Sequence, residues 1–276
     1  SGAVDYTVNC AVGFPTATGR GEEPVNHVLP AWDVAAGLYL ATGLLAAERA
    51  RKADGKGQEV SLALSDVALA TTGNLGSLAD VQVNDAVRPP MGNDLYGAFV
   101  RDFATADGRR VMIVAISNRQ WRALGTSTGL SDRLAMIGPM MDVDLNDEGG
   151  RFKAWHAICA VLEPWFAAHT LAEIRTAFKG TSVLWGPYQD FGQLVREDPA
   201  CSVANPMFGL IDQPGAGRIL APGAPLAFSH ATRCPPVPAP RLGGDTDAVL
   251  ADMLGLSGAQ IGKLHDAGTI AGPTEH

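Results

Sequence analysis

The sequence predicts an α/β protein, and two local patterns support this fold class. After Pro30, a long run rich in Ala, Leu and Gly repeats apolar residues at helical spacing, namely Val34, Leu38, Ala41 and Leu45. Two segments of strand-forming residues flank Asp107-Gly108, which is among the clearest short-range signals of a β-hairpin. Helical and strand periodicities therefore occur in one chain.

The helix after Pro30 is the best-defined element. Pro30 suits the first turn, because its φ is already fixed and its missing N–H costs nothing there. Asp33 follows in the same turn, where unpaired backbone N–H groups and the helix dipole stabilise a carboxylate. Basic residues suit the other end, at Arg49, Arg51 and Lys52. We expect a buried helix, with Asp33 a helix stabiliser on residue chemistry alone.

The remaining elements are predicted in chain order. Between this helix and the hairpin we expect a strand over 58–64 and a helix over 67–80 capped by Ser65-Asp66. A connection over 81–90 and a loop over 91–97 follow. The hairpin strands are 99–105 and 110–116. Later strands are expected over 182–186, 207–211 and 218–220, and later helices over 118–124, 150–168, 171–179, 245–256 and 259–265. Six prolines make 222–240 an extended linker.

Composition and charge exclude several classes of protein. The chain is 46% hydrophobic and 18% charged, which is ordinary for a globular protein with a sizeable core. Its net charge of −8 argues against nucleic acid or an anionic membrane as a general partner. The four cysteines and six histidines show neither disulfide-framework nor metal-site spacing. We see no signal peptide or membrane span and expect a cytoplasmic protein.

The segment from Pro30 to Leu64 resembles the central signature of the family III CoA-transferases. The matching features are Asp33, the basic helix end, Gly55-Lys56-Gly57-Gln58 and Val60-Ser61-Leu62. This family includes formyl-CoA transferase, carnitine CoA-transferase and the α-methylacyl-CoA racemases. The resemblance covers essentially the whole chain, and it implies that a nucleotide-type α/β half precedes residue 1.

The resemblance also implies a fold and an assembly. Residues 1–85 become the C-terminal part of a Rossmann-like large α/β domain, residues 86–205 a smaller α/β domain, and residues 206–276 a return linker with C-terminal helices. Two subunits of the family interlock like links of a chain, so we expect a homodimer. A separate chain supplying the N-terminal half is a further expected partner. We expect no nucleic acid or membrane partner.

The resemblance further implies a nucleophilic mechanism. In the family's transferases the aspartate at the position of Asp33 carries the acyl group, and coenzyme A enters as part of the substrate, with no permanently bound cofactor or metal. Segments 5–9, 13–15 and 24–33 resemble the family members that move CoA from C1 to C4 of mesaconyl-CoA. Substrate contacts are expected from Tyr6, His27, Gly92 and Asn93.

Several alternatives stay open at this point. Gly92-Asn93 also suits an ordinary turn, and His27 also suits a loop hydrogen bond. Intermolecular CoA transfer between carboxylic acids is one alternative activity, and an inactive fragment or one component of a split protein is another possibility. A racemase is disfavoured because its proton-transfer positions fall on Ala3 and Ser117. A serine hydrolase is disfavoured because the Gly125–Gly129 motif follows a predicted helix rather than a strand.

Overall fold

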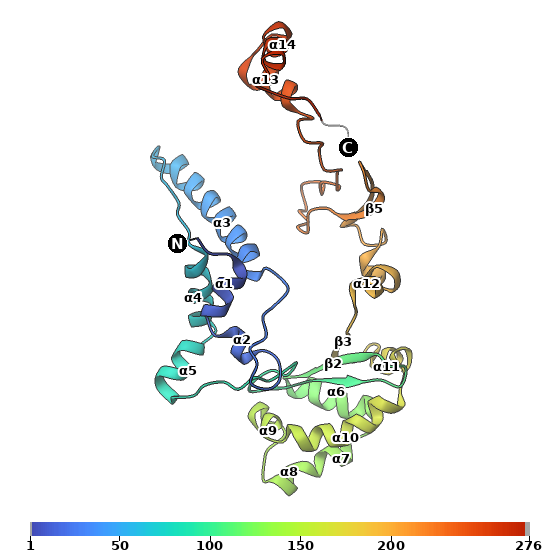
Figure 1. Cartoon of the computed structure of the whole chain (residues 1–276). Helices are drawn as coiled ribbons and strands as arrows, with labels where there is room; N and C mark the ends of the chain where they lie inside the picture. The colour runs from blue at the N-terminus through green and yellow to red at the C-terminus, as the bar shows by residue number, and fades with distance from the viewer. Residues whose placement is uncertain (1, 274–276) are drawn as a thin grey trace. The chain divides into compact units, whose positions relative to one another are not determined.

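The computed structural model describes residues 2–273 (Figure 1). They divide into two compact units, with the boundary between Tyr188 and Gln189. Each unit has its own secondary structure and is described by itself. The division into three domains at 85/86 and 205/206 stays a prediction.

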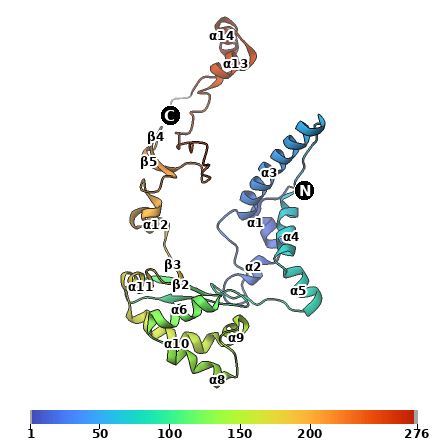
Figure 2. The same cartoon turned by 180° about the vertical axis from the view of Figure 1, so that it is seen from behind.

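The first unit begins with five helices. These are α1 (Asp5–Ala11), α2 (Phe14–Ala17), α3 (Ala31–Asp54), α4 (Leu64–Asn74) and α5 (Ser77–Asn84). Helices α3 and α4 lie side by side, and α1 packs against both (Figures 1 and 2). Their shared core consists of Val8, Val12, Trp32, Val67 and Ala68. This small core fixes the N-terminal end of α3.

Helix α3 confirms the predicted element but not its expected burial. Gly55, with a left-handed φ of 77°, ends it after the predicted basic residues. Trp32 is its buried residue, whereas Val34, Leu38 and Leu45 are more than half exposed. The expectation of a buried helix is therefore wrong for this chain, because the core that α1 and α4 share with α3 includes only residues from the first turns of α3.

The segment after α3 also differs from the prediction. Residues 58–63 form no strand, and no described strand pairs with them. A strand needs a partner for its backbone hydrogen bonds, so the alternating pattern alone cannot form one. Ser65 and Asp66 lie inside α4, whose N-cap is Ala63. Gly76, with a φ of 80°, divides the single predicted helix into α4 and α5.

A three-stranded antiparallel sheet lies at the centre of the rest of this unit. Its strands are β1 (Phe99–Ala104), β2 (Arg110–Ala115) and β3 (Leu184–Pro187), in the order β1-β2-β3. The hairpin and the later strand are confirmed. Gly108, with a φ of 72°, supplies the left-handed residue in the turn between β1 and β2. Residues 91–97 have no regular structure, as expected.

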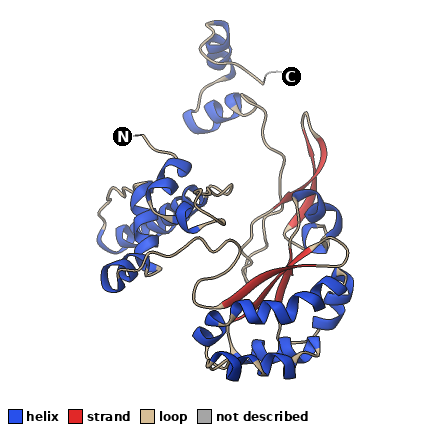
Figure 3. Ribbon diagram, turned by 60° about the horizontal axis from the view of Figure 1, so that its bottom comes forward, coloured by secondary structure: helices blue, strands red, loops and turns tan. Residues whose placement is uncertain are grey.

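Six helices accompany this sheet, on one face of it in Figure 3. They are α6 (Asn118–Thr128), α7 (Ser131–Ala135), α8 (Ile137–Met141), α9 (Glu148–Lys153), α10 (Trp155–Ala168) and α11 (Leu171–Phe178). The five-residue α7 and α8 were not predicted, because such short helices contain too few positions to show a period. Ser127 lies within α6, so the hydrolase motif lacks the strand it requires.

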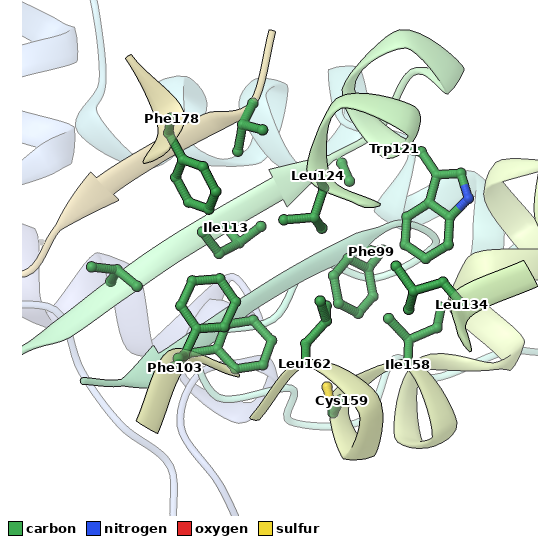
Figure 4. Close-up of a cluster of buried hydrophobic side chains, with 14 of the residues drawn as sticks. Phe99, Phe103, Ile113, Trp121, Leu124, Leu134, Ile158, Cys159, Leu162 and Phe178 are labelled. Carbon is green, nitrogen blue, oxygen red and sulfur yellow. The ribbon is translucent and has the colours of Figure 1, made fainter. Parts of the chain in front are cut away.

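The main core lies between the sheet and these helices (Figure 4). Phe99 and Phe103 of β1, Ile113 of β2 and Leu162 of α10 are almost fully buried. The rings of Phe103 and Phe166 stack with centroids 4.4 Å apart. Within residues 2–273 no single helix is long and apolar enough to cross a membrane; α10 and α11 meet that test only together, bent by 115°.

The second unit carries the C-terminal elements. These are α12 (Phe191–Glu197), the 3₁₀ turn η1 (Pro199–Cys201), β4 (Phe208–Gln213), β5 (Gly217–Pro222), α13 (Thr246–Leu254) and α14 (Gly258–Asp266). The two predicted strands and the two terminal helices are confirmed, and β4 and β5 pair as an antiparallel hairpin. Helix α12 was not predicted. Between β5 and α13 the chain is extended apart from a bridge between Phe228 and Ala231 and a turn at 242–245. That agrees with the proline-rich linker.

Candidate functional site

Asp33 is the third residue of α3, two positions after Ala31 begins the helix. Its side chain is exposed. Within residues 2–273 its carboxylate makes no hydrogen bond and no ion pair. The N-cap is Pro30, which contributes no side-chain hydrogen bond. The structure therefore presents an unpaired carboxylate at the N-terminal end of a long helix.

Asp5 of α1, rather than Asp33, has its carboxylate bonded to the backbone at the start of α3. Its side chain is buried, and one carboxylate oxygen accepts the backbone N–H of Trp32 at 2.6 Å. Burial raises the pKa of the Asp5 carboxyl, but hydrogen bonds from His27 and from the backbone of Trp32 and Asp33 outweigh it. The net pKa of Asp5 is lowered, so this buried group is an anion at neutral pH.

His27 is attached to the same buried carboxylate. Its Nε2 lies 2.6 Å from the second carboxylate oxygen of Asp5, so one carboxyl group joins the imidazole to the backbone at the start of α3. Tyr6 meets the ring of His27 edge-on, with centroids 6.2 Å apart, and its hydroxyl donates to the carbonyl of Val28 at 3.3 Å. His27 thus hydrogen-bonds the carboxyl group that also accepts the backbone N–H of Trp32.

Asn9 completes the polar network beneath this corner. Its side-chain oxygen accepts the indole N–H of Trp32 at 3.1 Å, and its amide donates to Asn26. Asn26 in turn accepts the backbone N–H of His27 at 3.0 Å. Asn9 is 2% exposed, so its hydrogen bonds replace those that water cannot provide.

Gly92 and Asn93 lie on a different segment of the first unit. Gly92 has a φ of 65°, and its N–H donates to the carbonyl of Gly19 at 2.5 Å. The side chain of Asn93 hydrogen-bonds Asp102. The Gly92 N–H is therefore already occupied in this conformation. Its expected role as an oxyanion donor stays a prediction.

The structure groups three of the five predicted site residues. Tyr6, His27 and Asp33 come together around the start of α3, whereas no contact links Asp33 to Gly92 or Asn93 among the described residues. Sequence reasoning missed Asp5 and Asn9. The only sequence signal for these two residues was the resemblance of segment 5–9 to family members. No spacing rule connects Asp5 to a helix that begins 26 residues later.

A cavity of about 760 Å³ lies elsewhere in this unit, between α6, α7, α8 and residues 142–146. None of its lining residues is a predicted site residue. Among the described residues, no three His, Cys, Asp or Glu side chains are arranged to hold a metal ion.

Comparison with known proteins identifies the family. The sequence pattern of CoA-transferase family III matches residues 1–246. This chain belongs to CoA-transferase family III. The family assignment makes the exposed Asp33 carboxylate at the start of α3 the first candidate for its chemistry.

Two curated relatives in the family are similar to this chain. The 2-methylfumaryl-CoA isomerase of Chloroflexus aurantiacus is 52% identical over 272 residues, which cover 98% of this chain and 66% of the relative. A formyl-CoA:oxalate CoA-transferase of Rhodopseudomonas palustris is 25% identical, with the same coverage of each. The chain thus spans 66% of the length of these relatives.

Solved structures show the family III fold as well. A CAIB/BAIF family protein from Brucella suis superposes with a TM-score of 0.68 at 20% identity, covering 91% of this chain and 63% of that chain. The protein Rv3272 of Mycobacterium tuberculosis gives a TM-score of 0.64 at 21% identity, covering 86% and 62%. At these identities the likeness concerns the fold alone.

Proposed function

We propose that the protein containing this chain is a CoA-transferase that moves CoA from C1 to C4 of 2-methylfumaryl-CoA, which is mesaconyl-CoA. The observation that carries the proposal is the exposed, unpaired carboxylate of Asp33 at the start of α3. The 52% identity to 2-methylfumaryl-CoA isomerase supports the choice of substrate.

The proposed reaction is covalent and uses only acyl exchanges. The Asp33 carboxylate attacks the thioester carbonyl, CoA thiolate leaves, and an aspartyl–acyl anhydride forms. CoA thiolate then attacks the Asp33 carbonyl, which gives an aspartyl-CoA thioester and a free dicarboxylate. The second carboxylate of the same acid attacks that thioester, and CoA thiolate leaves again. Attack of the thiolate on C4 finally releases the isomer and restores Asp33.

A carboxylate nucleophile suits this sequence of steps. Anhydrides and thioesters are both activated acyl groups, so each exchange stays near thermoneutral, whereas a serine ester would trap the acyl group. We propose that His27 binds the substrate's free carboxylate. Its position beside the start of α3 and its partial exposure support this role. Tyr6 packs on this ring and supports its orientation.

Two other activities of the family are weaker candidates. Intermolecular transfer between two acids uses the same nucleophile, and the formyl-CoA:oxalate CoA-transferase relative favours it at lower identity. A racemase is less suitable, because Ala3 has no ionisable group and Ser117 caps α6, accepting the N–H of Gln120 at 3.4 Å.

The larger assembly is part of the same proposal. We propose a cytoplasmic, interlocked homodimer whose large domain is Rossmann-like, with CoA entering only as part of the substrate. The half of that domain not contained in residues 1–276 lies either in the same polypeptide or in a second one. A mass spectrum of the intact native protein distinguishes one longer polypeptide from two separate chains. If this chain alone is present and binds no CoA, the chain is an inactive fragment.

The central test is Asp33→Asn in the native protein. Asn has nearly the same volume, so we expect folding and CoA binding to persist while turnover of mesaconyl-CoA falls by roughly three orders of magnitude or more. Wild-type protein incubated with acyl-CoA and then treated with hydroxylamine shows a mass change on the peptide containing Asp33. The Asn variant shows none.

Asp66→Asn is the matched control, since Asp66 is an exposed aspartate in the first turn of the neighbouring α4. This variant keeps both turnover and the mass change. An Asp33→Asn variant that turns over mesaconyl-CoA at the wild-type rate would show that Asp33 only stabilises α3, and the proposal would fail.

A further inference from the structure

The N-terminal end of α3 holds two aspartates in opposite states. Asp5 is buried and accepts backbone and imidazole hydrogen bonds, whereas Asp33 is exposed and accepts none from residues 2–273. A free helix N-terminus attracts carboxylates through its orphan N–H groups and its dipole. Asp33 lies in the first turn, so something must prevent it from binding there.

Asp5 removes the attraction by occupying the N-terminus itself. Its carboxylate takes the N–H of Trp32 at 2.6 Å and also interacts with the backbone of Asp33. Its negative charge compensates the positive end of the helix dipole. As a result, neither the N–H of Trp32 nor the positive end of the helix dipole remains available to the Asp33 carboxylate.

Pro30 removes the remaining donor. A side chain at the third helical position ordinarily reaches back to the backbone N–H of the N-cap residue. Here the N-cap is Pro30, which has no N–H. The reciprocal bond of a capping box is therefore closed to Asp33.

We propose that Asp5 is a positioning residue that, together with Pro30, keeps the Asp33 carboxylate free of hydrogen bonds and so maintains its nucleophilicity. This inference rests on the proposed function of Asp33. A carboxylate that accepts N–H bonds has its charge stabilised before it attacks, and it attacks more slowly for that reason. Asp5 is buried and acts on Asp33 through the backbone at the start of α3.

The first test replaces the charge of Asp5 and keeps its shape. In Asp5→Asn the amide oxygen still accepts the Trp32 N–H, but the dipole is uncompensated and one donor becomes available to Asp33. We expect kcat and the single-turnover rate of Asp33 acylation at saturating acyl-CoA to fall roughly tenfold. KM should rise as well, because Asp5 also holds His27, the proposed substrate-binding residue. Thr72→Val is the control: it removes a buried hydroxyl that bonds the carbonyl of Ala68 within α4, away from the start of α3, so it lowers the melting temperature and keeps kcat.

The second test works from the surface and does not depend on a buried substitution. Pro30→Ala restores the N-cap N–H at an exposed position, and we expect a severalfold loss of kcat with KM unchanged. Unchanged acylation rates in both folded variants would overturn the inference. Failure of the proposed function gives a different result: wild-type protein incubated with acyl-CoA would then show no adduct on Asp33.

Discussion

At the scale of single residues, two aspartates of the sheet region show how the surroundings decide a pKa. Asp102 of β1 is buried, and it pairs with Arg110 and, at 3.4 Å, with Arg20. Burial raises the pKa of Asp102. The hydrogen bonds from Arg110 and Asn93 and the charges of both arginines outweigh burial, so the net pKa is lowered. Asp94 pairs with Arg101, yet one of its oxygens is buried without a partner, and burial leaves its pKa raised.

These opposite shifts predict opposite dependences of stability on pH. The folded-state pKa of Asp102 lies below the ordinary aspartate value of 3.8, so its contribution to stability is present above that pH and is lost as the pH falls through the folded pKa. The stability gap between wild type and Asp102→Asn should therefore narrow below about pH 4. Thermal unfolding between about pH 7 and pH 2.5 measures this gap.

Asp94→Asn serves as the matched comparison. The folded-state pKa of Asp94 lies above 3.8, so ionisation costs stability as the pH rises through the folded pKa. As the pH rises, the free energy of unfolding of wild type should therefore fall relative to that of Asp94→Asn. Parallel curves for the two variants would contradict the assignment of burial as the dominant influence on Asp94.

At the scale of elements, the turn between β1 and β2 connects the sheet to α11. The Asp107 carboxylate accepts the hydroxyl of Thr105 at 2.6 Å and the backbone N–H of Leu171 at 3.2 Å. Leu171 begins α11, whose N-cap Thr170 forms a capping box with Glu173. One turn therefore fixes both the hairpin and a helix that follows 64 residues later.

Gly108→Ala tests the conformation of this turn. Gly108 has a φ of 72° with open space around its α-carbon, so a methyl group meets no clash and only the backbone strain remains. We expect a loss of about 1–2 kcal/mol in the free energy of unfolding, measured by urea denaturation. Gly186→Ala on β3 is the control, since Gly186 also has open space but no left-handed φ. Equal losses at the two sites would show that strain is not the cause.

At the scale of the whole molecule, the exposed apolar residues of α3 agree with the family comparison. Val34, Leu38 and Leu45 are exposed in a chain that spans 66% of the length of its relatives. Leu40 and Leu44 of the same helix are exposed as well, and large exposed apolar patches typically mark an interaction site. The proposed remainder of the large domain and a second subunit are the partners that the family resemblance implies.

The proposed interlocked dimer has a direct test. Two long connections without helix or strand, at 85–98 and 223–240, motivate this proposal. Sedimentation of the native protein should give twice the mass of one protomer across dilution to nanomolar concentration. A clean monomer in this experiment would exclude the interlocked dimer, whatever the activity of Asp33.

Local sequence signals predicted those elements whose stabilising interactions are local. Helix α3 was predicted from its spacing and its basic end, and the β1–β2 hairpin from Asp107-Gly108. The predicted strand at 58–64 failed because a strand depends on a partner that alternation does not supply. Helices α7 and α8 were missed because five residues contain little periodicity.

The sequence by itself determined that Asp33 lies in the first turn of a long helix, and its family signature pointed to a nucleophile. Only the tertiary structure decided how that turn is capped. Asp5 and His27, 28 and 6 residues before Asp33, meet at the start of α3 through one buried carboxyl group. Helix capping by a distant side chain depends on how α1 packs on α3, and packing of this kind leaves no periodic mark in the sequence.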